Sequence, residues 1–584
     1  MTHSLTWSIA ALLLIILLLS ASISSPAVAD DSPKPAVPAR TVAGDEGQSA
    51  ASTAAAVAAP LDPIKQMQQE AVRSQHADWG YWGDAPNRYS TWLSHSNRLI
   101  PIYTFGITLD RIRQKGSVYS DAARLEKLYG HLPADTLVEN ATYFDQTDVY
   151  HLQQQAIAEG KTQVILIVFD GMDWESTYNA ALYKAGAVAY TQGRGTGLVF
   201  QDYRGSATDY GGFVTSPRLG KCTIDVNLQT VAGGDQRTTG GYDPARGGDA
   251  PGVPAPQRSY PIGLDRTQPH TVTDSASSAT SMTAGIKTYN AAINVDVQGN
   301  QVETIAHQLQ RDRGFAIGVV TSVPISHATP AAAYAHNVSR DDYQDITRDL
   351  IGLPSVSHRQ EALPGVDVLL GCGWGEAAKK GAKQGDNFVP GREFYDPADL
   401  RRVAIEKGGK YVVTQRTAGR KGIDVLTDAK EAAIAGDHRL LGVFGAADGH
   451  LPFATADGRF DPALDVKGEA TYSAADIEEN PLLAEMALAA LETLKQDPDG
   501  FWLMVEAGDV DWANHANNID HSIGAVFSGD AAVKAVFDWV DAQQAWDQTA
   551  VIVTADHGHY FNLKDPQAVA DAGPATLASG SHCR

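Results

Sequence analysis

Apolar runs as long as a buried strand recur along the chain beyond Pro60, and stretches with helical spacing separate them. The strongest run is residues 164–169, Val-Ile-Leu-Ile-Val-Phe. Five further runs are residues 316–321, 366–370, 440–444, 501–505 and 550–554. Strands that alternate with helices build a mostly parallel sheet covered on both faces. The sequence therefore predicts an α/β fold with a mostly parallel, doubly wound central sheet flanked by helices.

One helix is predicted in detail between the runs at 440–444 and 501–505. Asn480 and Pro481 match an N-cap followed by proline at the first helical position. Apolar residues then keep a period of 3.6, namely Leu483, Met486, Ala487, Ala490, Leu491 and Leu494. This pattern is typical of a helix that packs on a sheet.

Two stretches lack the alternation. Residues 62–150 hold no run of buried-strand length, so an N-terminal helical segment is predicted over 61–160, laid against a main domain of residues 161–584. Residues 201–270 include seven glycines between positions 233 and 252. A structureless loop of this length is uncommon inside a compact domain. This Gly-rich insertion could be a lid that gates the substrate, and it could equally be a surface insertion without a role in the site.

The N-terminus has the pattern of an export signal. Residues 9–19 are an unbroken apolar run, and Ala27-Val28-Ala29 follows as an A-x-A cleavage pattern, so residues 1–29 are predicted to be a signal peptide. The run is shorter than the ~20 residues of a membrane anchor. A buried N-terminal helix is the alternative. Residues 30–60, rich in Ala and Pro, are predicted to be a disordered linker. A periplasmic or secreted protein without a membrane anchor is expected.

The cysteines add little to this picture. Export implies an oxidising compartment, in which cysteines usually pair. The chain contains only Cys222, Cys372 and Cys583, so at most one disulfide can form. Three scattered cysteines do not make a metal-binding set.

The charge balance narrows the range of partners. The chain has 46 Lys and Arg against 69 Asp and Glu, a formal net charge of −23 with histidine neutral. Nucleic acids and anionic membranes need a field of basic side chains, so neither is expected as the main partner. An anionic substrate would need cations or metals placed locally.

Carboxylates and imidazoles follow several of the predicted strands. They are Asp170, Glu506, Asp511, Asp556 and His557. Ligands of a doubly wound sheet bind beyond the carboxyl ends of the strands, so these side chains are expected at one edge. His515 lies four residues after Asp511, which places both on one face of a helix. Clustered carboxylates repel unless divalent cations lie among them, zinc suiting Asp/His sets and magnesium all-oxygen sets. Taken singly, each carboxylate is also explained as a turn or a helix cap.

Residues 272–280, Val-Thr-Asp-Ser-Ala-Ser-Ser-Ala-Thr, place Asp274 and Ser275 before small residues that favour the start of a helix. A serine there sees the positive end of the helix dipole, and backbone N–H groups would meet an attached phosphate. An ordinary Ser/Asp helix cap is the alternative.

Residues 274–280 match the nucleophile motif of the alkaline phosphatases at every position, and the chain resembles that family from about residue 161 to 560. Four further motifs follow in the family order: Thr288-Tyr289-Asn290, the stretch 327–336, Val505-Glu506 with Asp511 and His515, and the stretch 554–557. The resemblance implies hydrolysis of phosphate monoesters through a phosphoserine. Dimers are common in the family, which allows a homodimer here.

The resemblance also implies roles for single residues. Ser275 would be the nucleophile and Arg340 the arginine that holds the phosphate. Asp170, Asp556 and His557 would hold the zinc that activates the serine.

Further metal ligands follow from the same comparison. Asp170 would bridge to a magnesium ion. Thr329 and Glu506 would be the other protein ligands of that ion, and His327 is expected near it. Asp511 and His515 would belong to a second zinc.

The sequence departs from the family at its C-terminus. The family places a further histidine, the third protein ligand of the second zinc, several tens of residues after the Asp-His pair and just before a final strand. Here 27 residues follow His557, without a strand-like run, and their histidines are His559 and His582. Either one is a candidate replacement, although His559 also fits a residue that supports a metal ligand or one that lies at the surface. Without a replacement the second zinc site is incomplete, and the chain reads as shortened.

Three functional hypotheses follow. The first is an exported, zinc- and magnesium-dependent phosphomonoesterase. The second is a phosphodiesterase or sulfatase of the same fold, which the serine motif around Ser275 disfavours. The third is a catalytically impaired relative that binds phosphate and metal.

Overall fold

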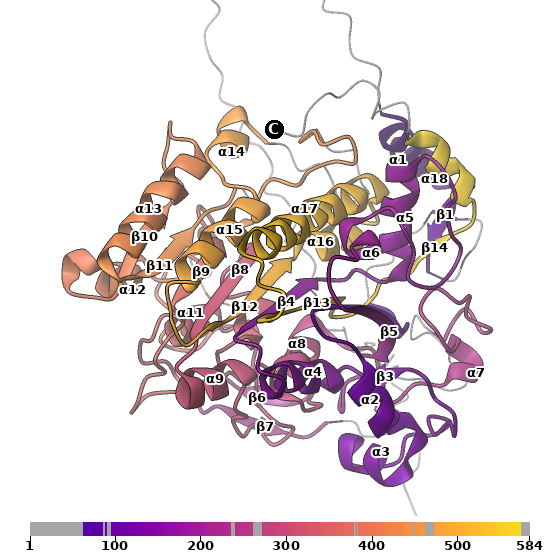
Figure 1. Ribbon diagram of the computed structural model, residues 1–584, viewed down its shortest axis with the longest axis horizontal. Helices are drawn as coiled ribbons and strands as arrows, with labels where there is room; N and C mark the ends of the chain where they lie inside the picture. Colours follow the sequence, from indigo (N-terminus) through magenta and orange to yellow (C-terminus); the bar gives the residue numbers. More distant parts are fainter. Residues whose placement is uncertain are drawn as a thin grey trace, which may run out of the picture.

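A ten-stranded sheet forms the centre of the molecule (Figure 1). The computed structural model describes residues 62–573 except 84, 86–87, 90–94, 235–239, 261–270, 379–380, 382, 447–448 and 462–471. The predicted signal peptide and linker, together with His582 and Cys583, lie outside the described residues.

The strands of the central sheet are, in spatial order, β10 (Tyr411–Gln415), β11 (Arg439–Val443), β9 (Val368–Cys372), β8 (Ala316–Pro324), β12 (Phe501–Ala507), β4 (Gln163–Phe169), β13 (Thr549–Ala555), β2 (Ile100–Phe105), β5 (Thr208–Val214) and β3 (Phe144–Asp145). β2 runs antiparallel to both of its neighbours, and the other pairings are parallel. The mostly parallel sheet is confirmed, as are all six predicted strands.

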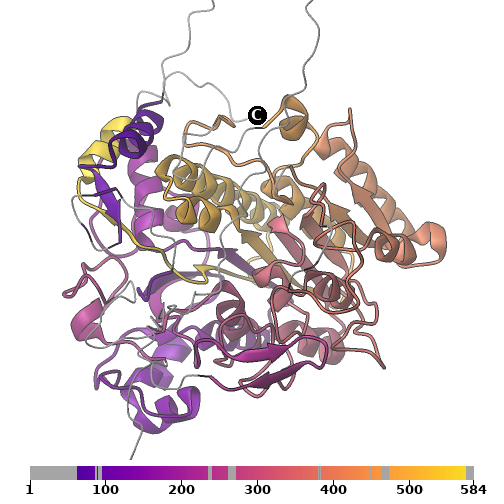
Figure 2. The same ribbon diagram turned by 180° about the vertical axis from the view of Figure 1, so that it is seen from behind.

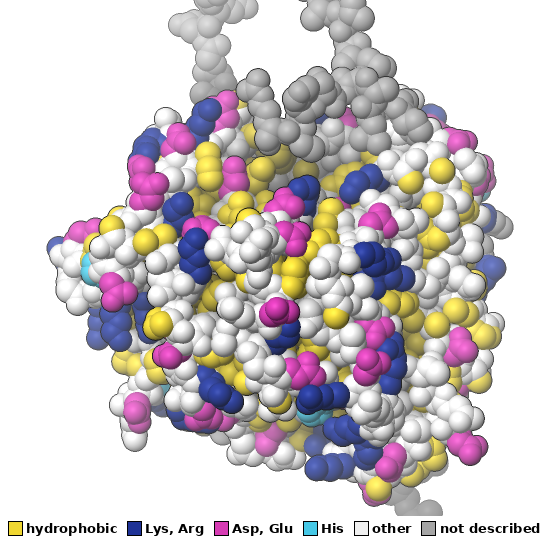
Figure 3. All heavy atoms as spheres, viewed as in Figure 1, with side chains coloured by type: hydrophobic (Ala, Val, Ile, Leu, Met, Phe, Trp, Pro, Cys, Tyr) yellow, Lys and Arg dark blue, Asp and Glu magenta, His cyan; other side chains and the backbone are white. Residues whose placement is uncertain are grey.

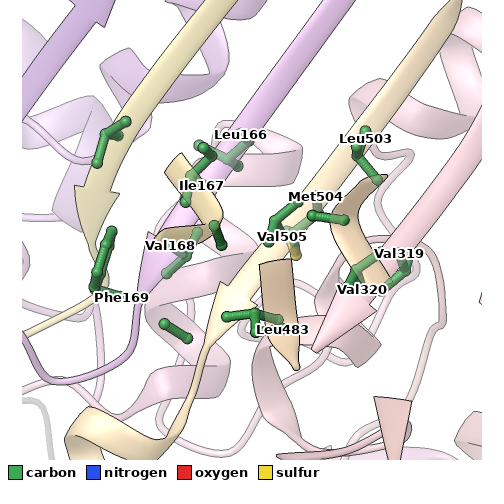
Figure 4. Close-up of a cluster of buried hydrophobic side chains, with 14 of the residues drawn as sticks. Leu166, Ile167, Val168, Phe169, Val319, Val320, Leu483, Leu503, Met504 and Val505 are labelled. Atoms are coloured by element: carbon green, nitrogen blue, oxygen red, sulfur yellow. The ribbon is translucent and has the colours of Figure 1, made fainter. Parts of the chain in front are cut away.

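The middle of the sheet is buried on both faces. Every residue of β8 and β12 is buried, and so are residues 164–169 of β4. Figure 4 shows side chains of these three strands packed together with Leu483. A strand covered on both faces needs apolar side chains at consecutive positions, which is why these runs stand out in the sequence.

Helices cover the two faces of the sheet (Figure 1, and from behind in Figure 2). One face carries α5 (Trp174–Ala185), α13 (Gly422–Gly436), α15 (Leu483–Leu494) and α17 (Ile519–Gln543). The other carries α4 (Thr147–Ala158), α8 (Ser275–Ala284) and α9 (Ile305–Arg313). This arrangement is the predicted doubly wound architecture.

Shorter elements complete the described chain. The helices are α1 (Pro63–Ser74), α2 (Asp110–Lys115), α3 (Ala122–Tyr129), α6 (Val199–Asp202), α7 (Pro244–Gly247), α10 (Ala328–Ala332), α11 (Tyr343–Leu350), α12 (Pro397–Val403), α14 (Ala474–Glu478), α16 (Asp509–His515) and α18 (Pro566–Ala572). Single 3₁₀ turns are η1 (Val118–Ser120) and η2 (Ile405–Lys407). Two small antiparallel sheets pair β1 (Gly80–Trp82) with β14 (Phe561–Leu563), and β6 (Thr223–Asp225) with β7 (Thr230–Ala232).

The start predicted for α15 is wrong by two residues. The helix begins at Leu483, and Asn480 does not cap it. The Asn480 side chain instead accepts a hydrogen bond from Gly445 N (2.6 Å) and donates one to Asp476 O (2.7 Å). Because these hydrogen bonds occupy the Asn480 side chain, it is not available to cap the helix. The six periodic apolar residues are all buried, as predicted.

The prediction of an N-terminal helical segment over 61–160 is wrong in part. The described residues of this segment form α1, α2, α3 and α4, but β2 is fully buried within the central sheet and β3 lies at its edge. The sequence of β2, Ile-Pro-Ile-Tyr-Thr-Phe, contains a proline and a threonine, which interrupt the apolar run. Its position between β13 and β5 nonetheless buries all six residues.

The described part of the Gly-rich insertion is not structureless. It contributes β5 to the central sheet and also forms β6, β7 and α7. Gly212 in β5 lies against Pro251, where a Cβ atom would come within 2.6 Å of its ring. Close packing thus requires glycine at this point. Because glycine adds no apolar side chain, β5 lacks the apolar run by which the other strands are predicted.

The described residues also bear on membrane anchoring, disulfide bonding and surface charge. Among the described residues, no helix is both long and apolar enough to span a membrane. Cys222 and Cys372 are both free thiols. On the face shown in Figure 3, basic and acidic side chains are interspersed.

Candidate active site at the carboxyl edge of the sheet

Three neighbouring strands bring carboxylates to one edge. Asp170 follows β4, Glu506 lies near the end of β12, and Asp556 follows β13. These strands are adjacent in the order β12-β4-β13, and all three side chains are fully buried. The convergence expected from the sequence is therefore present.

Ser275 is the first residue of α8 and points at this cluster. Its Oγ lies 3.1 Å from His557 Nε2 and 3.3 Å from Asp170 Oδ1. The N-cap of the helix is Asp274, which accepts a hydrogen bond from Ser277 N (3.0 Å). The two interpretations of this motif are thus compatible, because Asp274 caps the helix and Ser275 occupies its positive end.

A further contact fixes α8 to the end of β13. Ser278 Oγ and Gln146 Nε2 both donate hydrogen bonds to the carbonyl oxygen of Asp556, at 2.6 and 2.8 Å. Gln146 Nε2 also hydrogen-bonds Ser278 Oγ. Sequence reasoning missed Gln146, because a lone glutamine far from every motif carries no signal.

Asp170, Asp556 and His557 form a group suited to a metal ion, since one ligand atom from each lies within 4.8 Å of the others. His557 Nε2 is 3.3 Å from Asp170 Oδ1 and 3.4 Å from Asp556 Oδ2. Asp170 Oδ2 and Asp556 Oδ2 are buried and accept no hydrogen bond within the described part of the chain. Burial raises the pKa of Asp170 well above its usual range, and the charges of Asp556 and Asp511 raise it further. A divalent cation would relieve this repulsion, so the donor set fits one.

Glu506 lies beside this group. Burial raises the pKa of Glu506 to about 8, although the hydrogen bond from Thr321 and the nearby hydroxyl of Thr329 favour its ionised form. Thr321 Oγ1 donates to Glu506 Oε2. Thr321 of β8, which sequence reasoning missed, is thus a hydrogen-bond partner of Glu506, whereas the buried Thr329 hydroxyl near Glu506 has no hydrogen-bond partner among the described residues.

Asp511 and His515 lie on one face of α16, as predicted, with His515 Nε2 3.4 Å from Asp511 Oδ2. His559 donates a hydrogen bond from Nε2 to Asp511 Oδ1 at 2.6 Å. His559 is buried, which excludes the surface position considered from the sequence, and burial lowers its pKa well below the usual range.

Gly171 makes room for this arrangement. Its φ is +68°, and a Cβ atom there would lie 2.8 Å from His559 Nε2 and 2.9 Å from Asp511 Oδ1. Glycine satisfies both the left-handed backbone and the close approach of these two side chains.

His95 also lies at this site, and sequence reasoning missed it. Its Nε2 is 3.2 Å from His515 Nε2 and 3.9 Å from Asp511 Oδ1, and its ring stacks on His557 with centroids 3.7 Å apart. His95, Asp511, His557 and His559 form a second group whose ligand atoms lie within 4.8 Å of one another. No local pattern marks His95, because it is a single histidine in a stretch expected to be helical.

Arg340 is buried next to the serine helix. Its Nη1 is 3.3 Å from Asp274 Oδ2, and its Nη2 is 3.3 Å from His327 Nε2. The ring of His327 packs edge-on against Trp512, with centroids 5.9 Å apart. The guanidinium is thus held beside the residue that precedes Ser275.

Fold and site together define an α/β protein with a buried serine–carboxylate–histidine centre, and comparison with known proteins supplies the family. The sequence model described as alkaline phosphatase matches residues 255–577. The chain belongs to the alkaline phosphatase family.

Curated relatives show the extent of the similarity. Alkaline phosphatase H of Pseudomonas aeruginosa is 31% identical over 58% of this chain and 68% of its own length. Alkaline phosphatase of Escherichia fergusonii is 32% identical over 57% and 67%. Alkaline phosphatase 3 of Bacillus subtilis is 31% identical over 51% and 52%, so the match spans about half the length of that relative. Among solved structures, the cold-active alkaline phosphatase from the psychrophile Shewanella sp. is 21% identical over 68% of each chain, with a TM-score of 0.39.

Proposed function

We propose that the protein hydrolyses phosphate monoesters with Ser275 as the nucleophile. The observation that carries this proposal is the position of the Ser275 hydroxyl at the N-terminus of α8, 3.1 Å from His557 Nε2 and 3.3 Å from Asp170 Oδ1. Membership of the alkaline phosphatase family supports the same chemistry.

Ser275 Oγ would attack the phosphorus atom in line, so that a new P–O bond forms and the ester P–O bond breaks. The alcohol leaves with a proton, and water then cleaves the phosphoserine to release phosphate. The backbone N–H groups in the first turn of α8 favour the anionic phosphoryl group. The hydrogen bonds from Ser278 and Gln146 to Asp556 keep the serine helix against the carboxylates.

The donor sets fit three metal ions. Asp170, Asp556 and His557 would hold one zinc, and Asp511 and His515 would belong to a second. Thr329 and Glu506, together with Asp170, would hold magnesium. When bound, such ions act as Lewis acids on the phosphoryl oxygens and lower the pKa of the serine hydroxyl and of the attacking water.

Arg340 would hold two oxygens of the phosphoryl group, a task that suits a planar guanidinium. Its contacts with Asp274 and His327 fix the guanidinium in place before substrate binds. His327 and His559 would act by positioning Arg340 and Asp511, respectively.

A phosphodiesterase or sulfatase of the same fold, and a relative that binds phosphate without turnover, are the competing functions. Purified protein supplied with zinc and magnesium separates them through rates on p-nitrophenyl phosphate, bis(p-nitrophenyl) phosphate and p-nitrophenyl sulfate. We expect the monoester to react fastest and to leave a trappable phosphate on Ser275. Faster hydrolysis of the diester or the sulfate, or no hydrolysis at all, would refute the proposal.

Export completes the proposed function. Residues 1–29 carry a signal pattern, so the mature protein is expected in the periplasm or outside the cell. N-terminal sequencing of protein recovered from the periplasm and medium tests this point. Sedimentation of the same material tests for a homodimer.

A further inference from the structure

We propose that His95 is the third protein ligand of the metal site formed by Asp511 and His515, so that a residue from the N-terminal side of the fold completes the centre. The inference rests on the proposed function in one respect, which is that this site binds zinc. It assigns the ligand position that sequence comparison left open between His559 and His582.

The direction of β2 brings His95 to the site. β2 runs antiparallel to β13, so the residues before β2 lie at the same edge of the sheet as the residues after β13. Ser96 and Gly558 form an antiparallel bridge, in which Ser96 N donates to Gly558 O at 2.8 Å. This bridge places His95 directly beside the stretch that contains His557 and His559.

The hydrogen bond of His95 fixes which of its nitrogens faces the site. Nδ1 lies 2.8 Å from the carbonyl oxygen of Thr273. A carbonyl only accepts, so Nδ1 carries the hydrogen and Nε2 carries the lone pair. Histidines that bind metals typically donate their other ring N–H to a carbonyl or carboxylate in this way.

The distances around Nε2 match a shared metal ion. The Nε2 atoms of His95 and His515 are 3.2 Å apart, and two Zn–N bonds of ~2.0–2.1 Å at a tetrahedral centre separate their nitrogens by about 3.3 Å. Asp511 presents Oδ1 3.9 Å from His95 Nε2 and Oδ2 3.4 Å from His515 Nε2. Two histidines and one aspartate supply the three ligands of a catalytic zinc site and leave one position open.

His559 has a different task. Its Nε2 lies 2.6 Å from Asp511 Oδ1, and a carboxylate accepts hydrogen bonds, so this nitrogen carries the hydrogen. A nitrogen that donates to Asp511 cannot bind a metal at the same time. His559 therefore positions Asp511, whereas His95 offers its lone pair to the site.

The segment that carries His95 is firmly anchored. Arg98 donates to Asp173 Oδ2 (2.9 Å) and to Asn562 Oδ1 (2.6 Å), and these contacts join the residues before β2 to the N-cap of α5 and to β14.

Zinc binding by the full chain tests the assignment. The variants are His95→Ala, the closer mimic His95→Gln, His559→Ala and, as a matched control, His438→Ala at an exposed position. Zinc stoichiometry after dialysis, and the affinity of each zinc by chelator competition, are measured together with the visible spectrum of the cobalt-substituted protein. Circular dichroism establishes that each variant is folded.

We expect wild type and His438→Ala to bind two zinc ions tightly. In both His95 variants the affinity for one zinc ion should fall by more than about 100-fold, beyond the 10- to 100-fold effect of losing a residue that hydrogen-bonds to a metal ligand. They should also change the cobalt spectrum. His559→Ala should fall within that smaller range. Added imidazole should restore zinc binding to a His95→Gly variant, an effect that a merely structural role would not produce.

The inference would be overturned if the His95 variants bound two zinc ions with wild-type affinity. It would also be overturned if His559→Ala lost more zinc affinity than His95→Ala. So would a wild-type chain that binds no second zinc. Failure of the proposed function looks different, because a chain could bind both zinc ions through His95 and still hydrolyse no phosphate ester.

Discussion

The hydroxyl oxygen of Ser275 lies 3.1 Å from Nε2 of His557, although 282 positions separate the two residues. The contact joins the first turn of α8 to the loop that follows β13. It is built by tertiary packing, and it makes the role of a single oxygen atom testable.

Replacing Ser275 by alanine removes that oxygen and little else. We expect Ser275→Ala to lower kcat by at least about 10³-fold, because no other hydroxyl takes over the attack. Its zinc content and circular dichroism should match wild type. Ser281→Ala, in the same helix, removes a hydroxyl that donates a hydrogen bond to Ser277 O, and this variant should retain activity. Near-normal turnover by Ser275→Ala would show that the nucleophile is elsewhere.

Arg340→Ala should have a smaller effect on turnover. Loss of one cationic donor to the phosphoryl group is expected to cost about 10²-fold in kcat/KM and to weaken inhibition by inorganic phosphate. Arg340→Lys should be intermediate, because it keeps the charge without the planar fork. Steady-state kinetics with phosphate as inhibitor measure both effects, and unchanged inhibition would argue against phosphate binding by Arg340.

Gly171→Ala should damage the site around Asp511 without replacing any of the proposed metal ligands. A Cβ atom there collides with Asp511 and His559, so we expect one metal ion to bind about 10- to 100-fold more weakly. Gly160→Ala is the matched control, since Gly160 also has a positive φ (+86°) but its Cβ would meet open space. Equal zinc affinities in the two variants would disprove the steric argument.

Removing metal should destabilise the protein, and more so as the pH rises. In the metal-free fold, burial raises the pKa of Glu506 to about 8, above its ordinary value of 4.5. The folded state therefore binds more protons than the unfolded state, and stability falls as the pH rises towards 8. Thermal unfolding with and without EDTA should show a gap in Tm that is wider at pH 8 than at pH 6.5. A gap that narrows with pH would contradict this sign.

Acid should destabilise the fold through His336, a buried histidine to which the proposed function assigns no role. Burial, together with the charge of His307, lowers the pKa of His336 to about 3. Between that value and 6.5 only the unfolded state is protonated, so stability falls as the pH drops below 6.5. From pH 7.5 to 5 the cost is about 2 kcal/mol for one such group.

His336→Gln tests this effect, because the amide can still donate to Val302 O in place of Nε2. Urea unfolding should show a loss between pH 7.5 and 5 that is about 2 kcal/mol smaller in the variant than in wild type. His438→Gln, at an exposed position, is the control. The same acid-induced loss in all three proteins would exclude His336 as the cause.

Much of the sheet could be predicted from the sequence, for a physical reason. β4, β8 and β12 are buried on both faces, so their apolar runs are continuous. β2 was not predicted because Pro101 and Thr104 interrupt its apolar pattern. β5 was not predicted because two adjacent glycines interrupt its pattern. In both strands, burial by neighbours outweighs local propensity.

The site residues likewise separate into those that a local sequence pattern predicts and those that it does not. Asp170, Glu506 and Asp556 follow from their place at strand ends, since parallel strands bring such residues to one edge. His95 and Gln146 could not be found in this way, because their positions depend on where β2 and α4 pack. Strand order and direction are properties of the whole sheet, and no local pattern around His95 encodes them.

The place of β2 in the sheet also bears on how the protein is made. A ribosome delivers β2 and β5 early, so their pairing can form while most of the chain is still unsynthesised. The other edge of β2 stays open until β13 emerges, and an open apolar edge invites pairing with other chains. Docking of β13 then covers that edge and brings Asp556 and His557 next to His95. The step that covers the open edge of the nascent sheet would therefore be the same late step that completes the proposed metal centre.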